Sequence, residues 1–463
     1  MPEDTITAIA TPNYEAALAI IRISGLQSFE IISKIFQPQN NINFNTVSSH
    51  TAHYGTVTDP DDNSQIIDEV IVTMFRAPRS YTCEDMIEIS CHGNPLLAQK
   101  ILHTIIKAGA RLAMPGEFTK RAFLNGRIDL TQAEAVIDLI TAKTDTAAQA
   151  AIKHLQGAIL DRYKIIQDSL LNILTELETQ IDFPEDVTSA TNNTSLRSRL
   201  LSLKKTIHKL VDSYKNGSLI KNGLSVAITG KVNTGKSSLF NILSHRPERA
   251  LVSHVPATTR DIIKEYILIN GRQFTIMDTA GMKTPRGIVE KQSLTLTRRE
   301  IKEANLIIFI LDASKSIGPK DLAIWNLVRN KKPIVVINKI DLQPKISPAR
   351  IEKKLKIENV HCLSCKTEEG IDSLEEKIVH QSRTLMLPIP DNYPVINNIR
   401  HKIILQKIDL CLSDALTAIE KNLSAEFISA DIRNALENLE ELTGKRVTEQ
   451  VLETIFSKFC IGK

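Results

Sequence analysis

Short apolar runs separated by turn residues characterise the first part of the chain. The runs at residues 19–23 and 70–72 have the length and the β-branched content of strands. Turn-forming pairs at residues 59–60 and 77–78, each ending in proline, separate such runs from their neighbours. This pattern predicts an α+β domain over residues 1–119.

The pattern changes to a helical period between residues 120 and 214. Apolar residues recur at intervals of three, four and seven positions, which places them on one face of a helix. We therefore predict long helices, interrupted near Pro184, as the first part of an all-helical domain. The positions with this period are Ile152, Leu155, Ile159, Ile166, Leu170, Leu174 and Leu177.

Strand-like runs and helical segments alternate between residues 215 and 384. This alternation is typical of a parallel sheet with crossover helices. It predicts a three-layer α/β domain. The strand-like runs are residues 224–229, 274–277, 306–311 and 334–337.

Helical periodicity returns in residues 385–463, where Gly444 is the expected cap of one helix. The simplest arrangement is one helical domain split by an inserted α/β domain, because insertions are tolerated where the ends of the host chain lie close together. The chain is therefore predicted to be a multidomain α/β protein. The periodic apolar positions are Ile403, Ile404, Ile408, Leu412, Leu416, Ile432, Leu436 and Leu439.

Composition narrows the setting of these domains. The 463 residues carry 57 Lys and Arg against 53 Asp and Glu, and the net charge of +4 neither favours nor excludes a nucleic-acid partner. Six cysteines in so long a chain are too sparse for a disulfide framework, so we interpret them as reduced thiols. No signal peptide or membrane-length apolar stretch is present, and we expect a cytoplasmic protein with no membrane partner.

Residues 230–237 read Gly-Lys-Val-Asn-Thr-Gly-Lys-Ser, a phosphate-loop pattern that directly follows a predicted strand. Glycines let backbone N–H groups face the phosphates at a helix N-terminus, Lys236 would neutralise the outer phosphates, and Ser237 would offer its hydroxyl to Mg²⁺. An ordinary glycine turn is the alternative, which the motifs that follow exclude. The GTP-binding residues predicted in this loop are Asn233, Thr234, Gly235, Lys236, Ser237 and Ser238.

Two further motifs close predicted strands and define the nucleotide. Residues 278–281, Asp-Thr-Ala-Gly, would set a carboxylate beside Mg²⁺ and a glycine N–H near the γ-phosphate. In residues 338–341 the Asp341 carboxylate can accept hydrogen bonds from the N1–H and N2–H groups that guanine has and adenine lacks, which predicts GTP rather than ATP. The predicted GTP-binding residues are Asp278, Thr279, Ala280, Gly281, Asn338, Lys339 and Asp341.

A fifth GTPase motif, whose backbone supports the base, is matched after the short run at residues 361–363. Cys362 and Cys365 have the spacing of half a metal or redox site, but the chain has no second pair, so packing is the favoured interpretation. The residues predicted to bind GTP here are Ser364, Cys365 and Lys366.

The polar loop before Asp261 is the predicted first switch, in which Thr259 is the candidate to reach Mg²⁺ when the γ-phosphate orders the loop. Met282 stands where Ras-type enzymes place a water-orienting glutamine. Either hydrolysis is slow, or a cation, a switch carboxylate or a second subunit supplies the missing group. The polar candidates are Arg260, Arg286 and Glu290, and the predicted GTP-binding loop residues are Ser253, His254, Val255, Pro256, Ala257, Thr258 and Thr259.

Sequence blocks outside the nucleotide site resemble one family. Pro-Gly-Glu-Phe-Thr at residues 115–119, Arg-Ala-Phe-Leu-Asn-Gly at 121–126 and Phe-Cys-Ile-Gly-Lys at 459–463 do not follow from binding GTP. With these blocks, nearly the whole chain resembles the MnmE or TrmE family of tRNA-modification GTPases. It departs from the family pattern at residues 13–18, Cys83, Arg127, Val232 and Ala257.

The resemblance implies a folate-binding N-terminal domain that dimerises, and a G domain whose pairing across the homodimer accelerates hydrolysis. It implies K⁺ in place of an arginine finger, neutralising developing charge, and Glu290 as the water-orienting residue. The alternative for Glu290 is a solvated carboxylate at a helix start. The K⁺ positions implied by the resemblance are Asn233, Ser253, Val255 and Thr258.

The same resemblance implies that Arg22, Glu88, Arg127 and Lys463 contact a tetrahydrofolate derivative, in its 5-formyl or methylene form. A strand ion pair is the alternative for Arg22 and Glu88. The resemblance also implies a heterocomplex with a flavin-dependent protein similar to MnmG or GidA. That complex would add a carboxymethylaminomethyl-type group at C5 of the wobble uridine of certain tRNAs.

Cys460 lies at helical spacing from Phe456, which favours a small core residue, whereas the resemblance ties this thiol to the modification reaction, as a catalytic nucleophile would be.

Two other functions remain open. The chain could be an assembly or signalling switch without a direct role in modification, or a folate-dependent methyltransferase-like enzyme with a regulatory G domain. The segment 460–463 favours the modification enzyme, because a generic switch has no evident use for it.

Overall fold

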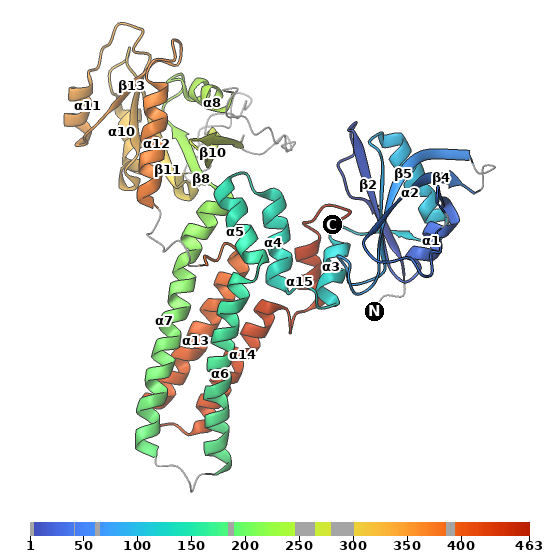
Figure 1. The fold of residues 1–463 in the computed structure, drawn as a ribbon. Helices are drawn as coiled ribbons and strands as arrows, with labels where there is room; N and C mark the ends of the chain where they lie inside the picture. Colours follow the sequence, from blue (N-terminus) through green and yellow to red (C-terminus); the bar gives the residue numbers. More distant parts are fainter. Residues whose placement is uncertain are drawn as a thin grey trace, which may run out of the picture. The chain divides into compact units, whose positions relative to one another are not determined.

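A computed structural model describes residues 4–40, 42–60, 65–183, 189–245, 264–278, 301–385 and 394–463. The chain divides into two compact units. The first unit comprises Met1–Ile140, Ala151–Lys204 and Lys407–Lys463, and the second comprises Thr141–Ala150 and Lys205–Gln406. Figure 1 shows the helices and strands with the labels used below. No helix among the described residues is both long and apolar enough to span a bilayer.

The first unit begins with a seven-stranded sheet in the order β3-β4-β5-β6-β2-β1-β7, in which only β1 and β7 pair in parallel. Alternate residues face opposite sides, so Ile21 and Ile23 are buried against α1 and α2 while Arg22 lies on the other face. The elements are β1 (Ile6–Ile9), β2 (Leu18–Ser24), α1 (Ser28–Ile35), β3 (Phe36–Pro38), β4 (Thr51–Asp59), β5 (Gln65–Phe75), β6 (Met86–His92), α2 (Pro95–Lys107) and β7 (Arg111–Leu112).

Helices follow the sheet, and within the first unit helices from both ends of the chain pack together. Arg433 of α14 pairs with Glu178 of α6 at 2.7 Å, and Arg197 of α7 pairs with Glu420 of α13 at 3.1 Å. The helices are α3 (Glu117–Leu124), α4 (Leu130–Thr141), α5 (Asp145–Leu155), α6 (Ala158–Asp182), α7 (Ser189–Asn222), α13 (Ile399–Glu420), α14 (Ala425–Thr443) and α15 (Glu449–Phe456).

These pairings confirm the split helical domain, because α6 and α7 precede the α/β segment and α13 and α14 follow it. The predicted cap of α14 is also confirmed. Gly444 has φ of +89° and its N–H donates to the Glu440 carbonyl oxygen at 3.0 Å. The predicted interruption at Pro184 lies outside the described residues.

The second unit is built on a six-stranded sheet in the order β13-β12-β11-β8-β10-β9, parallel except for the β9–β10 hairpin. The predicted apolar runs all lie within its strands. The elements are β8 (Leu224–Thr229), α8 (Lys236–Ser244), β9 (Lys264–Ile269), β10 (Arg272–Asp278), β11 (Leu306–Asp312), α10 (Pro319–Val328), the 3₁₀ turn η2 (Arg329–Lys331), β12 (Ile334–Asn338), α11 (Pro348–Leu355), β13 (His361–Leu363) and α12 (Ile371–Leu385).

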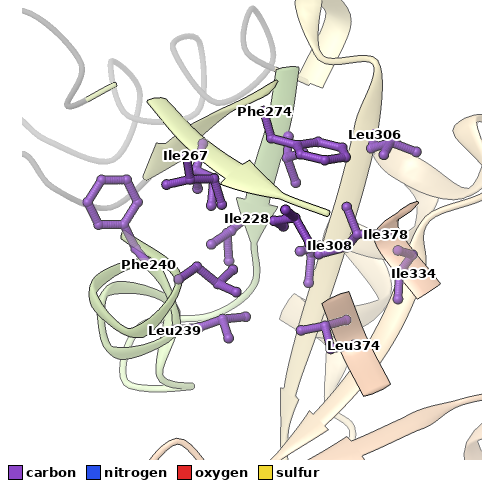
Figure 2. Packing of buried hydrophobic residues seen from close by; sticks show 14 of the residues in the cluster. Ile228, Leu239, Phe240, Ile267, Phe274, Leu306, Ile308, Ile334, Leu374 and Ile378 are labelled. Carbon is purple, nitrogen blue, oxygen red and sulfur yellow. The ribbon is translucent and has the colours of Figure 1, made fainter. Parts of the chain in front are cut away.

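Two apolar layers cover the two faces of this sheet. Ile308 of β11 packs with Leu239 of α8 and Leu374 of α12 on one face, as Figure 2 shows. Phe309, the next residue, packs with Trp325 of α10 on the other face. Every residue of β11 is buried, which is why the strand appears in the sequence as a continuous apolar run. The predicted multidomain α/β fold is confirmed.

Candidate nucleotide site and N-terminal site

The phosphate-binding loop connects β8 to α8, at the carboxyl edge of the parallel sheet. Gly230 has φ of +157°, and a Cβ there would lie 2.4 Å from the Ile310 carbonyl oxygen, so the loop passes too close to β11 for a side chain. Gly235 has φ of +99° and directly precedes the first residue of α8. The glycines of the motif therefore serve the close approach and the left-handed turn that this loop needs.

Three predicted nucleotide residues stand where α8 begins. Lys236 is buried, and its Nζ donates to the Lys231 carbonyl oxygen at 2.6 Å, so its ammonium group is folded over the loop. Ser237 and Ser238 follow in the first turn, where backbone N–H groups point towards the end of the helix. A helix start with these donors and an ammonium group is suited to bind phosphate oxygens.

Asn338 joins three of the predicted motifs. It ends β12, is almost fully buried, and donates from Nδ2 to the Thr234 carbonyl oxygen at 2.8 Å. Its Oδ1 accepts the backbone N–H of Lys339 at 2.8 Å and that of Cys365 at 3.0 Å. Hydrogen bonds of Asn338 thus join the base-recognition loop (residues 338–341) to the phosphate loop (residues 230–237) and to the fifth motif (residues 364–366).

The carboxylate predicted to recognise guanine is held by the fifth motif. Ser364 Oγ donates to Asp341 Oδ1 at 2.6 Å and itself accepts the Lys366 N–H at 3.2 Å. Because one carboxylate oxygen is fixed in this way, the orientation of Asp341 is set by the chain rather than by a ligand. A preoriented carboxylate can accept the paired N–H groups of guanine.

Lys339 is the third side chain of the base-recognition loop. Its Nζ donates to the Asn233 carbonyl oxygen at 2.7 Å and to Asp312 Oδ2 at 2.8 Å. Burial acts to raise the pKa of Asp312, but hydrogen bonds from Lys339 and Ser314 outweigh it and hold that pKa below the ordinary value. Asp312 is therefore ionised and forms a stable charge pair with Lys339 at neutral pH.

The cysteines of the Cys362–Cys365 spacing do not form a metal site. Cys365 packs against the apolar layer that contains Ile308, whereas Cys362 packs against the layer that contains Phe309, on the opposite face. Burial raises the pKa of Cys365 to about 11, and raises that of Cys362 as well, so both thiols stay protonated. Throughout the described ranges no cluster of three His, Cys, Asp or Glu residues could hold a metal ion.

Part of the predicted nucleotide site lies outside the described residues. The backbone of Asp278 ends β10 beside Ile228 of β8, which brings that strand end next to the phosphate loop, but its side chain is not described. The remaining predicted positions outside the described residues are Ser253, His254, Val255, Pro256, Ala257, Thr258, Thr259, Thr279, Ala280, Gly281 and Glu290, together with Arg260, Met282 and Arg286.

The first unit brings together the four residues predicted to contact folate. Arg22 and Glu88 are paired across β2 and β6, and Arg22 Nε donates to Glu88 Oε1 at 2.8 Å. Arg22 Nη1 also donates to the Gly462 carbonyl oxygen at 3.2 Å, which holds the C-terminal segment beside the pair. Burial, together with the nearby Arg22 charge, lowers the pKa of Lys463, whereas Glu88 opposes this shift.

Tyr81 connects Arg127 to this group. The Arg127 guanidinium lies 4.9 Å from the centre of the Tyr81 ring, and the Arg22 guanidinium lies 5.8 Å from it. The Tyr81 hydroxyl is 3.0 Å from Thr119 Oγ1, which fixes the ring at the start of α3. The strand ion pair that the sequence allowed for Arg22 and Glu88 is present, but it is part of a larger polar group with an aromatic wall.

The position of Cys460 corrects one interpretation of the sequence. Helix α15 ends at Phe456 and Cys460 is exposed, so the small core residue suggested by its spacing is wrong. Its carbonyl oxygen accepts the Gly116 N–H at 3.4 Å, and Gly462 has φ of +91°, where an added Cβ would lie 2.6 Å from the Ile9 carbonyl oxygen. The C-terminal segment thus lies along the N-terminal domain with its thiol facing solvent.

A buried charge cluster joins α3 to the N-terminal domain. Arg121 is almost completely buried and donates to Asp4 Oδ1 at 2.8 Å and to Glu84 Oε2 at 3.1 Å. Arg111 donates from Nη1 to Glu117 Oε2 at 2.9 Å. The Arg111 hydrogen bond, opposing the effect of burial, holds the pKa of Glu117 below its ordinary value.

Two residues of these sites were missed in the sequence. They are Tyr81 and Asp312, neither of which is among the site residues predicted from the sequence. Asp312 carries a recognisable signal, since it directly follows a continuous apolar run, and the carboxyl ends of parallel strands meet at one edge of the sheet. No comparable signal marks Tyr81, because its partners come from distant parts of the chain.

A phosphate-binding loop hydrogen-bonded to a guanine-selective loop at the carboxyl edge of a parallel sheet defines a P-loop GTPase. Comparison with protein families specifies which one. The family described as the MnmE helical domain matches residues 130–460, and the GTP-binding protein TrmE N-terminus matches residues 5–127. The chain belongs to the MnmE family of tRNA modification GTPases.

Individual relatives are similar over their whole length. The tRNA modification GTPase MnmE of Thermoanaerobacter pseudethanolicus is 41% identical over 460 residues, covering 99% of both chains. The protein of that name from Bacillus subtilis is 40% identical over 463 residues, covering 99% of this chain and 100% of the relative. A solved structure of the G domain of the T. maritima FeoB iron transporter shares 26% identity, covering 34% of this chain and 98% of that one with a TM-score of 0.28.

Proposed function

We propose that the chain hydrolyses GTP with K⁺ stimulation as its G domains pair across a homodimer. This turnover drives a heterocomplex with a flavin-dependent protein similar to MnmG, which adds a carboxymethylaminomethyl-type group at C5 of the wobble uridine of certain tRNAs. The observation that carries the proposal is the bonding of Asn338 to the phosphate loop and to the fifth motif, which supports a guanine nucleotide because it joins the three motifs of a GTPase site. Family membership supports the link to tRNA modification.

In this proposal the chain supplies binding and orientation for phosphoryl transfer. Lys236 neutralises the outer phosphates, while Ser237, Thr259 and the carboxylate of Asp278 serve the Mg²⁺ site. Mg²⁺ neutralises charge on the β- and γ-phosphates when bound. The arrangement fits, since the hydroxyl residue Ser237 is in the first turn of α8 and the end of β10 lies beside β8.

The catalytic group comes from the switch segments, because the phosphate loop carries no arginine in position to reach the γ-phosphate. Glu290 orients the attacking water, and K⁺ neutralises developing charge at Asn233, Ser253, Val255 and Thr258. Asn233 fits a ligand position, because its φ of +64° places it at the left-handed bend of the loop. Pairing of two G domains would order the switches that carry the other positions.

The N-terminal site fits a tetrahydrofolate derivative. Glu88 can accept hydrogen bonds from the N–H groups of a pterin ring, and Arg22, Arg127 and Lys463 can pair with the carboxylates of the glutamate tail. Tyr81 offers an aromatic face between the two guanidinium groups. The folate would carry the one-carbon unit, with Cys460 as an exposed thiol for the modification step.

We further propose functional boundaries for the domains. Residues 1–119 bind folate and dimerise, residues 120–214 and 385–463 form the helical domain, and residues 215–384 form the G domain. The pairing of helices α6 with α14 and α7 with α13 supports this division.

Turnover of GTP in KCl and NaCl of equal ionic strength tests the catalytic part. We expect K⁺ to stimulate turnover of the full chain at least tenfold, on the order of the contribution of a charge-stabilising group, and the Glu290→Ala variant to lose that stimulation while binding GDP normally. Equal turnover in both salts, or an unaffected variant, would contradict the mechanism.

Analysis of tRNA nucleosides separates this enzyme from a pure switch. Cells that lack the protein should lose the C5-modified wobble uridine, and the Glu290→Ala variant should fail to restore it. If the modified nucleoside persists in the deletion strain, the chain is an assembly or signalling switch and the modification role is wrong.

A further inference from the structure

Asp312 lies at the junction of the two loops that bind the nucleotide. It ends β11 directly beside Asn338, its partner in the parallel pair with β12, and the Ala313 N–H donates to the Asn338 carbonyl oxygen at 2.8 Å. The Asp312 side chain is only 3% exposed. A carboxylate buried to this degree needs partners that justify its loss of hydration.

The two oxygens of Asp312 have different partners. Oδ1 accepts the backbone N–H of Ser314 at 3.0 Å and the Ser314 hydroxyl at 2.7 Å. Oδ2 accepts Lys339 Nζ at 2.8 Å. Lys315, on the surface, comes within only 3.8 Å of Oδ2. The Ser314 bonds fix the plane of the carboxylate, and that plane aims Oδ2 at Lys339.

Lys339 in turn holds the phosphate loop. Its Nζ donates to the Asn233 carbonyl oxygen at 2.7 Å, and its backbone has φ of +69°, a left-handed conformation that is unfavourable for an L-residue. Surrounding contacts must stabilise this conformation, and the bond to Asp312 is one of them.

We propose that Asp312 is a positioning residue of the nucleotide site, which holds Lys339 against the phosphate loop and so sets the affinity for guanine nucleotides without touching them. The charge pair is ready before the nucleotide arrives, since the hydrogen bonds from Lys339 and Ser314 keep Asp312 ionised at neutral pH. Without its bond to Asp312 the Lys339 side chain samples other rotamers. Binding of a nucleotide must then order this side chain, which lowers the affinity. This inference rests on the guanine site of the proposed function and adds a residue to it.

A graded set of variants tests the proposal, with GDP affinity measured by titration of a fluorescent GDP analogue on the full chain. Asp312→Asn keeps the shape of the side chain but loses the charge-assisted hydrogen bond to Lys339. It should weaken the binding of GDP and of inosine diphosphate (IDP) equally, by about tenfold. Ser314→Ala frees Oδ1 and should weaken binding by about threefold. Lys315→Met removes only the distant surface charge and should bind as the wild type does. The turnover rate at saturating GTP should stay unchanged in all three variants. The lost interaction stabilises the bound ground state and the transition state equally, so its loss raises KM and leaves kcat unchanged.

A double-mutant cycle separates positioning from general stability. In a Lys339→Met background, Asp312→Asn should cause no further loss of affinity, because the group that it positions is gone. The proposal is overturned if Asp312→Asn and Ser314→Ala both bind GDP normally, or if Asp312→Asn costs the same in both backgrounds. The Asp341→Asn variant tests the guanine site separately. If this variant still prefers GDP over xanthosine diphosphate (XDP), the assignment of guanine recognition to Asp341 is wrong, whatever the Asp312 variants show.

Discussion

The side chain of Asn338 donates a hydrogen bond to the carbonyl oxygen of Thr234, with 2.8 Å between the two atoms. This contact joins the end of β12 to the loop before α8, which lie 104 residues apart in the sequence. Because the base-recognition loop and the phosphate loop share this bond, a change in one loop is transmitted to the other. The residue after Thr234 is Gly235, which has no room for a side chain beside this bond.

Gly235→Ala should disrupt both loops at once. A Cβ at this position would lie 2.1 Å from Asn338 Nδ2, and φ of +99° already disfavours a side chain. We expect GDP affinity to fall by at least a hundredfold, roughly 2.7 kcal/mol, as measured by titration. Gly271→Ala is the matched control, because Gly271 also has positive φ, +71°, but no atom lies within 4 Å of its Cβ position. Comparable loss in the control would show that strain alone, rather than the Asn338 contact, is responsible.

Asp341→Asn should exchange guanine for xanthine. The variant side chain offers N–H donors where the carboxylate accepted them, and xanthine carries an oxygen in place of the guanine 2-amino group. The contact from Ser364 Oγ to the side-chain oxygen can be kept. Competition of GDP and XDP for the bound fluorescent nucleotide measures the change, for which we expect a reversal of preference of on the order of a thousandfold. Retained preference for GDP would place base recognition elsewhere.

Cys83→Gly should stabilise the N-terminal domain. Cys83 has φ of +60°, a left-handed conformation that glycine adopts without strain, and relief of the strain exceeds the extra entropy of the unfolded glycine by about 0.5 kcal/mol. Urea unfolding followed by far-UV circular dichroism measures the gain. The single tryptophan, Trp325, is buried in the second unit, so its fluorescence should report no change. Cys83→Ala keeps the strain, and an equal gain in that variant would assign the effect to the thiol.

Acid should weaken the junction between α3 and the N-terminal domain. The folded-state pKa of Glu117 lies below its ordinary value of 4.5, since the Arg111 hydrogen bond and the Met114 N–H favour the charged form. The unfolded chain therefore binds more protons, so this stabilisation is complete above the unfolded pKa and is lost as the pH falls through the folded pKa. We expect stability to decline as the pH falls below the ordinary pKa of 4.5, and Glu117→Gln to show a shallower decline in the same unfolding assay. Identical pH profiles would remove Glu117 from the acid response.

The elements of the G domain could be predicted because their signals are local. A buried parallel strand is a continuous apolar run, and a phosphate loop is eight consecutive residues, so β8, β11 and the loop of residues 230–237 are visible within short windows. The candidate GTP-binding residues in residues 233–238, 338–341 and 364–366 come together as these windows indicate.

Contacts between distant segments could not be predicted in this way. The bond from Arg22 to Gly462 joins residues 440 positions apart, and only the resemblance to a family placed Arg22 together with the neighbouring residue Lys463. Local periodicity also misled at Cys460, since α15 ends at Phe456 and the chain then turns along the N-terminal domain. Where a segment leaves its helix to meet a distant strand, the helical period no longer determines burial.

That distant contact makes Gly462 the sharpest probe of the N-terminal site. A Cβ on Gly462 would lie 2.6 Å from the Ile9 carbonyl oxygen, so Gly462→Ala should move the C-terminal segment and displace Lys463 from Arg22 and Glu88. We expect affinity for 5-formyltetrahydrofolate, measured by calorimetry, to fall by about tenfold or more, as the loss of a charged contact would cause, while GTP turnover in K⁺ stays unchanged. Gly157→Ala is the control, because Gly157 has nearly the same φ, +94° against +91°, with no atom within 4 Å. The control carries nearly the same backbone strain without the collision, and it should bind folate normally. Normal folate binding by Gly462→Ala as well would mean that the C-terminal segment is not part of the folate site.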